Sequence, residues 1–141
     1  MMLNLKEWIA KVTQKLSITG TTYVSSLKNL SITATNINTY TQGASVTLPA
    51  GTYVIKGSFS FNSVSGATNR VVDTDLSTVA GSTADLAPLG RARTVNSAGN
   101  WVCLEAIAIV TFNSRTTVYV KGSSTHTSTG STSDIRAVRI A

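Results

Sequence analysis

The stretch from Tyr53 to Phe61 constrains the fold of this chain more than any other part of the sequence. Its alternate positions are apolar or aromatic on one side and mostly polar on the other, a period of two that fits a β-strand. The apolar positions are Tyr53, Ile55, Gly57, Phe59 and Phe61. Directly before them, Pro49-Ala50-Gly51 predicts a tight corner after a short strand over residues 46–48. The rest of the chain must therefore supply strands that cover one aromatic face.

Strand patterns separated by turn signals continue to the end of the sequence. The predicted strands cover residues 70–79, 101–112, 116–121 and 134–141. The near-continuous apolar residues of 101–112 predict a buried strand, while 80–100 and 122–133 are predicted to be loops. About seven to nine short strands without interleaved helices predict an all-β fold, an antiparallel β-sandwich of two sheets. At 141 residues the chain is expected to form one domain.

A short α-helix is predicted ahead of the sandwich, over residues 4–16. Asn4 and Glu7 have the spacing of a capping box. One apolar stripe follows the helical spacing: Leu5, Trp8, Ile9, Val12 and Leu16. A helix this short is marginal alone in water, so its stripe must dock on its own sheet, on copies of the chain or on a larger assembly. We expect self-association or anchoring, which divides the chain into a helix (1–16), a linker with the first strand (17–31) and the sandwich (32–141).

The amino-acid composition indicates which classes of partner this chain is expected to bind. Charged side chains make up 13% of the residues, roughly half of their usual share in globular proteins. A net charge of +6 favours polyanions, but the basic residues are scattered, so no specific nucleic-acid binding is expected. Charged residues between Lys6 and Lys15 interrupt any signal peptide, and no apolar run approaches the ~20 residues that span a bilayer. We expect a protein made in a cytoplasm, with no membrane partner.

No catalytic or metal-binding constellation stands out. His126 is the only histidine, so a zinc site lacks a second imidazole, and a solvated loop position is expected. Asp73-Thr74-Asp75 resembles the start of a calcium loop but lacks the glycine and glutamate of an EF-hand. A solvated turn, or a pair with Arg70, is expected there instead. The sequence therefore predicts no enzyme, no metal and no cofactor.

Two polar residues lie within the predicted buried strand over 101–112. A buried charge must be paired, which predicts Arg136 or Arg139 as the partner of Glu105. Cys103 is the only cysteine and is expected to be a buried structural thiol. The acids that follow the helix are Asp73, Asp75, Asp85, Glu105 and Asp134. A glycosidase-type carboxylate pair is not expected from so few acids.

The segment from Val46 to Tyr53, the alternating Phe59 and Phe61, and a later hairpin that ends at Val118-Tyr119-Val120-Lys121 together resemble the jelly roll of the C1q and tumour-necrosis-factor superfamily. The similarity covers roughly residues 32–141. It implies a homotrimer whose aromatic sheet faces the three-fold axis. The residues of this trimer or core face are Tyr53, Ile55, Phe59, Phe61 and Tyr119.

The opening residues from Leu5 to Thr13 resemble the short helices that begin tail-fibre and other virion proteins of bacteriophages. An anchoring helix before a trimeric jelly-roll head is similar to phage receptor-binding and head-fibre proteins. This resemblance implies a virion structural protein that attaches to other virion proteins through its N-terminus. A capsid decoration or head-fibre subunit without a receptor, and a monomeric cellular carbohydrate-binding module, are the alternatives.

A receptor-binding head would contact a host cell-surface glycan. Sugar sites use aromatic side chains with amide and charged partners, and the available set is Arg91, Arg93, Asn100 and Trp101. The competing interpretation of Trp101 is core packing at the start of a strand. The sequence does not identify a receptor.

Overall fold

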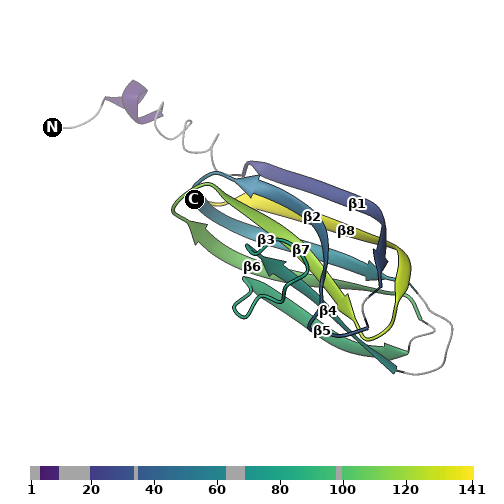
Figure 1. Cartoon of the computed structure of the whole chain (residues 1–141). Helices are drawn as coiled ribbons and strands as arrows, with labels where there is room; N and C mark the ends of the chain where they lie inside the picture. The colour runs from purple at the N-terminus through teal and green to yellow at the C-terminus, as the bar shows by residue number, and fades with distance from the viewer. Residues whose placement is uncertain (1–3, 10–19, 34, 63–68, 98–99) are drawn as a thin grey trace.

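The computed structural model describes residues 4–9, 20–33, 35–62, 69–97 and 100–141 (Figure 1). These residues form eight β-strands in two four-stranded sheets, preceded by one short helix. The strands are β1 (Thr22–Ile32), β2 (Thr41–Leu48), β3 (Gly51–Phe61), β4 (Asn69–Ser77), β5 (Gly90–Ser97), β6 (Val102–Phe112), β7 (Thr116–Ser124) and β8 (Ser128–Arg139). The predicted all-β sandwich is confirmed.

The strand order defines a jelly roll. One sheet has the order β1-β8-β3-β6 and the other β2-β7-β4-β5, and every pairing is antiparallel. The first strand therefore pairs with the last, the second with the seventh, the third with the sixth and the fourth with the fifth. Such nested pairing arises when one long antiparallel hairpin is wrapped into two sheets, as in double-sheet jelly rolls. Because β1 pairs with β8, most of the predicted linker segment 17–31 lies in the sandwich.

The aromatic face of β3 forms the core between the two sheets. Tyr53, Ile55, Phe59 and Phe61 are fully buried, and the rings of Phe59 and Phe61 have centroids 5.2 Å apart. Val118 and Val120 of β7 and Leu76 of β4 cover this face from the other sheet and are also fully buried. The core thus lies within a single chain. Tyr119 points to the opposite side of β7 from these valines and is half-buried.

Two glycines allow the sheets to approach closely. A Cβ atom at Gly122 of β7 would lie 2.6 Å from Cγ of Phe59, and one at Gly57 of β3 would lie 2.6 Å from Cδ2 of Leu76. Real side chains do not tolerate such contacts, so these glycines leave the space that a large side chain of the opposite sheet fills. The two contacts are reciprocal: each sheet supplies one glycine and one large side chain.

Strand β6 differs from the buried strand that the sequence predicted. Its side chains alternate, with Ala106 and Ala108 buried and Cys103, Glu105 and Ile107 exposed. The reason is that β6 lies at the edge of a sheet that is covered on only one face. The predictions of a buried Cys103 and of core packing for Trp101 are therefore wrong, since Trp101 is 62% exposed.

The two predicted loops are also partly strand. The segment 80–100 contains β5, and most of 122–133 belongs to β7 and β8. Serine-rich stretches can form buried strands here because their hydroxyls find partners. Ser133 Oγ accepts a hydrogen bond from the backbone amide of Ala44 at 3.0 Å, and the hydroxyls of Ser128 and Ser131 lie 3.1 Å apart. A pattern based on apolar residues cannot detect such strands.

The N-terminal helix is described over residues 5–9. Asn4 caps it, because Asn4 Oδ1 accepts a hydrogen bond from the amide of Glu7 at 3.0 Å. Leu5, Trp8 and Ile9 are 70%, 56% and 49% exposed. Val12 and Leu16, which complete the predicted stripe, lie outside the described residues. Within the described part of the chain, no helix has the length and apolar character needed to cross a bilayer.

Gly122→Ala is expected to lower the free energy of unfolding by about 1–3 kcal/mol, because the added methyl group collides with the Phe59 ring. Urea denaturation of both proteins measures this change. In a Phe59→Leu background the ring is gone, so the same glycine substitution should cost less. Equal costs in the two backgrounds would contradict the proposed contact.

Candidate functional site

Two arginine–aspartate pairs lie on the outside of the β2-β7-β4-β5 sheet. The register of β4 and β5 places Asp73 opposite Arg93 and Asp75 opposite Arg91. Both pairs are bidentate: Arg93 donates to the two oxygens of Asp73 at 2.8 and 2.6 Å, and Arg91 to those of Asp75 at 2.8 and 2.7 Å. The aspartates are buried, so each carboxylate needs the fixed fork of its arginine.

Tyr40, from the loop before β2, and Lys121 of β7 extend the cluster formed by the two arginine–aspartate pairs. The Tyr40 hydroxyl donates to Asp73 Oδ2 at 3.0 Å, and Lys121 Nζ lies 5.7 Å from the centre of the Tyr40 ring. Lys121 also donates to the backbone carbonyls of Val79 and Thr83. Burial lowers the pKa of Lys121, although Asp85 and Asp75 oppose this effect. The buried charges thus hold the loops before β2 and before β5 against the sheet.

Arg70 has a different role from the predicted aspartate partner. It is fully buried and donates to the backbone carbonyls of Phe61, Asn62 and Asn100 at 3.0, 2.6 and 2.7 Å, and to Asn96 Oδ1 at 3.1 Å. Burial lowers its pKa. The sequence missed this role because the carbonyl acceptors belong to segments far from Arg70 in the chain.

The four predicted sugar-binding residues are divided between the two sheets. Arg91 and Arg93 belong to β5, in one sheet, while Asn100 and Trp101 directly precede β6, in the other. The guanidinium groups of both arginines already hold buried carboxylates, which leaves them fewer donors for a ligand. Trp101 remains exposed and available.

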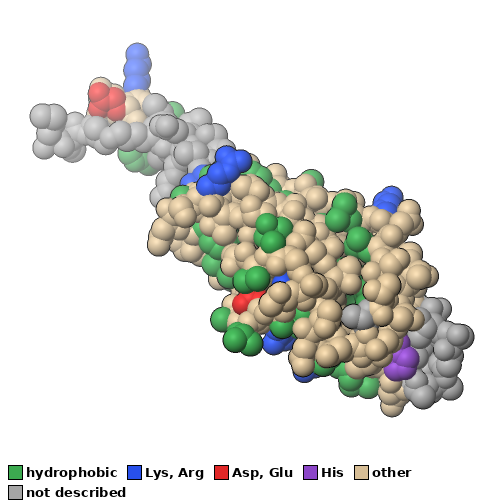
Figure 2. All heavy atoms as spheres, in the orientation of Figure 1, with side chains coloured by type: hydrophobic (Ala, Val, Ile, Leu, Met, Phe, Trp, Pro, Cys, Tyr) green, Lys and Arg blue, Asp and Glu red, His purple; other side chains and the backbone are tan. Residues whose placement is uncertain are grey.

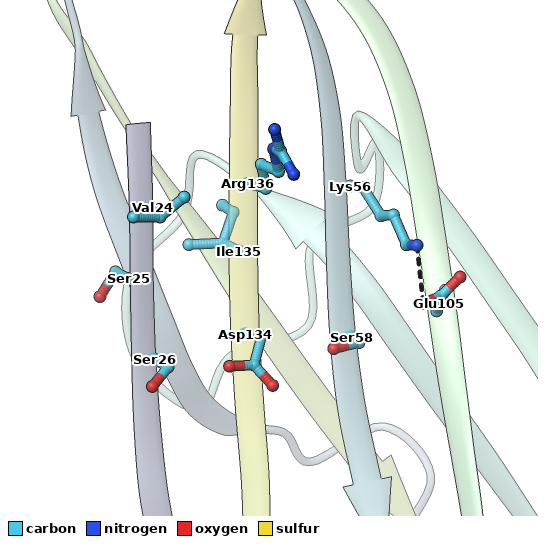
Figure 3. Close-up of a pocket in the computed structure, with 9 residues that line it drawn as sticks. All are labelled: Val24, Ser25, Ser26, Lys56, Ser58, Glu105, Asp134, Ile135 and Arg136. Atoms are coloured by element: carbon cyan, nitrogen blue, oxygen red, sulfur yellow. Dashed lines mark ion pairs between the residues drawn. The ribbon is translucent and has the colours of Figure 1, made fainter. Parts of the chain in front are cut away.

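A second cluster lies on the solvent-facing side of the β1-β8-β3-β6 sheet, here called the outer face. It surrounds an open depression of about 420 Å³ (Figure 3). Its polar lining consists of Ser25, Ser26, Lys56, Ser58, Glu105, Asp134 and Arg136, with Val24 and Ile135 as the apolar part. None of these residues belongs to the predicted sugar-binding set. Sequence patterns could not reveal the cluster because it draws on four strands.

Glu105 pairs with Lys56 rather than with the predicted Arg136 or Arg139. Lys56 Nζ lies 3.0 Å from Glu105 Oε1, and both side chains are about half exposed. The register explains the change of partner: β3 lies between β8 and β6, so Lys56 is the diagonal neighbour of Glu105. This exposed pair contributes little to stability.

Asp134 and Arg136 keep their charges open to solvent. Neither side chain forms a hydrogen bond or ion pair with the residues that the structure describes. The pairing registers place Asp134 directly between Ser26 of β1 and Ser58 of β3, as Figure 3 shows. A carboxylate flanked by two hydroxyls can bind a ligand that both donates and accepts hydrogen bonds.

Two other titratable side chains, His126 and Asp85, lie in loops between strands. Across the described residues, no three His, Cys, Asp or Glu side chains lie close enough to hold a metal ion. His126 is half-buried in the turn between β7 and β8, where its Nδ1 lies 3.1 Å from the Thr125 hydroxyl. Asp85 accepts from Ser77 Oγ at 2.6 Å, and despite burial this bond and the Ala87 amide keep its pKa lowered.

The fold and these clusters define a jelly-roll β-sandwich with an exposed helix at its N-terminus. No protein-family model matches the sequence, and no curated protein matches it either. Among solved structures, a chain of infectious bursal disease virus, Gx strain, is similar, with a TM-score of 0.48 and 12% sequence identity. The match covers 87% of the present chain and 32% of that chain, so this chain spans about a third of the length of its structural neighbour.

The stability of the protein is expected to fall between pH 10 and pH 12 because of Tyr40. Burial, with Asp75 and Asp73 nearby, raises the pKa of Tyr40 from 10.0 to about 12. Below pH 10 the phenol is protonated in both states, and above it the unfolded state ionises first. The free energy of unfolding should then fall by up to about 1.4 kcal/mol per pH unit.

Tyr40→Phe removes this titration, so its stability should depend less steeply on pH over the same range. Urea denaturation at several pH values compares the two proteins. Parallel pH profiles would show that Tyr40 is not held in the protonated form by the buried aspartates.

Proposed function

We propose that this chain is a structural protein of a bacteriophage particle, with a jelly-roll head and an N-terminal helix that attaches to other virion proteins. One observation carries the proposal: the helix exposes Leu5, Trp8 and Ile9, although the head has a complete core of its own. Apolar side chains gathered on a capped helix are unfavourable in water, and a partner that covers them removes this cost. The resemblance to phage fibre proteins supplies the class of partner.

The surface of the head suits a particle component. Figure 2 shows a visible face dominated by neutral polar side chains and backbone, with few charged side chains. Two buried carboxylates are neutralised by arginine, and the exposed carboxylate of Glu105 lies against Lys56. We propose a binding and assembly role rather than an enzymatic one, because the described residues place exposed polar groups and apolar helix side chains where other molecules can contact them.

We further propose that the head forms a homotrimer, as the resemblance to the C1q and tumour-necrosis-factor superfamily implies. The aromatic face that the resemblance placed at the three-fold axis is the buried core of one chain. The contact between copies must therefore use other surfaces, and half-buried Tyr119 on the outside of β7 is one available side chain.

Trp8→Asp is expected to abolish attachment to the particle, because a buried charge in an apolar contact costs several kcal/mol. Particles of the encoding phage, produced without this protein, are mixed with purified chain and sedimented through a density gradient. The original chain should sediment with the particles, and the variant should stay at the top.

Leu86→Asp is the matched control, since Leu86 is 98% exposed on a loop of the head. It should sediment like the original chain. Equal sedimentation of the Trp8 variant, or the absence of this protein from complete particles by mass spectrometry, would contradict the proposal. A decoration subunit without a receptor would pass this test and bind no glycan.

A further inference from the structure

We propose that the outer face binds a neutral oligosaccharide, with the depression around Asp134 holding sugar hydroxyls and Trp101 stacking on a second ring. This inference deepens the proposed function, because it gives the head a receptor-binding site. The proposed site does not include Arg91 and Arg93 of the predicted sugar site, because they hold buried aspartates. It consists instead of residues that line the open depression.

The lining of the depression matches the chemistry of a sugar. Each sugar hydroxyl donates one hydrogen bond and accepts others, so it needs acceptors and donors side by side. Asp134 supplies two acceptor oxygens, and Arg136 supplies donors. The hydroxyls of Ser26 and Ser58, the neighbours of Asp134, can both donate and accept hydrogen bonds. Because Asp134 and Arg136 have no hydrogen-bond or ion-pair partner among the described residues, binding breaks no existing interaction of theirs.

The charge of the depression favours a neutral ligand. Its two basic groups, Lys56 and Arg136, are balanced by Glu105 and Asp134. The whole chain has a net charge of +6, so this balanced region differs from the rest of the protein and gives a polyanion no particular advantage here.

Trp101 extends the site along β6. Exposed side chains alternate along this strand, and continuing the alternation past Val102 puts Trp101 on the same face as Cys103 and Glu105. Glu105 follows Trp101 by four positions, roughly 13 Å in an extended strand. An indole platform can stack on the apolar face of a sugar ring, and this separation requires a ligand of several linked rings rather than a monosaccharide.

The experiment is an NMR titration of the full chain, labelled with ¹⁵N, with three neutral probes: cellotetraose, maltotetraose and chitotetraose. At least one probe should shift the amide signals of Ser26, Ser58 and Asp134 together with the indole signal of Trp101. Asp134→Asn keeps the shape but removes the charged acceptor, and Trp101→Ala removes the platform. Each variant should weaken the apparent affinity at least tenfold, whereas Leu86→Ala should leave it unchanged.

Two results would overturn the inference. One is the absence of shifts with all three probes at millimolar concentration, while the spectrum shows a folded protein. The other is a set of shifts confined to the surroundings of Arg91 and Arg93. Neither result bears on attachment through Trp8, so failure of the sugar site and failure of the virion role are distinguishable by the sedimentation experiment.

Discussion

The structure depends on the close approach of its two sheets at Gly57 and Gly122. Each glycine faces a large side chain of the opposite sheet, Leu76 for the first and Phe59 for the second. This arrangement lets the aromatic face of β3 pack directly against β4 and β7 of the opposite sheet. It also makes the core self-sufficient within one chain, so the surfaces that remain exposed are free for contacts with other molecules.

Outside the core, buried charged groups rather than apolar contacts hold two loops on the β2-β7-β4-β5 sheet. The loops before β2 and β5 are held on their sheet by the aspartates of β4, Lys121 and Tyr40. Removing one partner from such a cluster would leave a buried charge unpaired, which costs several kcal/mol. The main role of Arg91 and Arg93 is therefore to stabilise the fold by pairing with Asp75 and Asp73. Among the residues that the structure describes, none covers the opposite sheet in this way, and its polar groups on the outer face are open to solvent.

The sequence predicted the β3 strand, the corner before it and the Asn4 cap because each depends on residues close together in the chain. It failed where long-range contacts decide the outcome. The apolar run at 102–112 became a half-exposed edge strand, since its position in the sheet is set by the strand order. The depression around Asp134 was likewise unpredictable, because it forms only when the register aligns β1, β8, β3 and β6.

We propose separate tasks for the two parts of the chain: the head assembles with its own copies, and the helix is left free to attach to the particle. The most direct test is the solution mass of the full chain, measured by light scattering beside a chain that lacks residues 1–16. Under this proposal we expect a trimer in both cases. A monomer in both would contradict it and would favour an isolated carbohydrate-binding module.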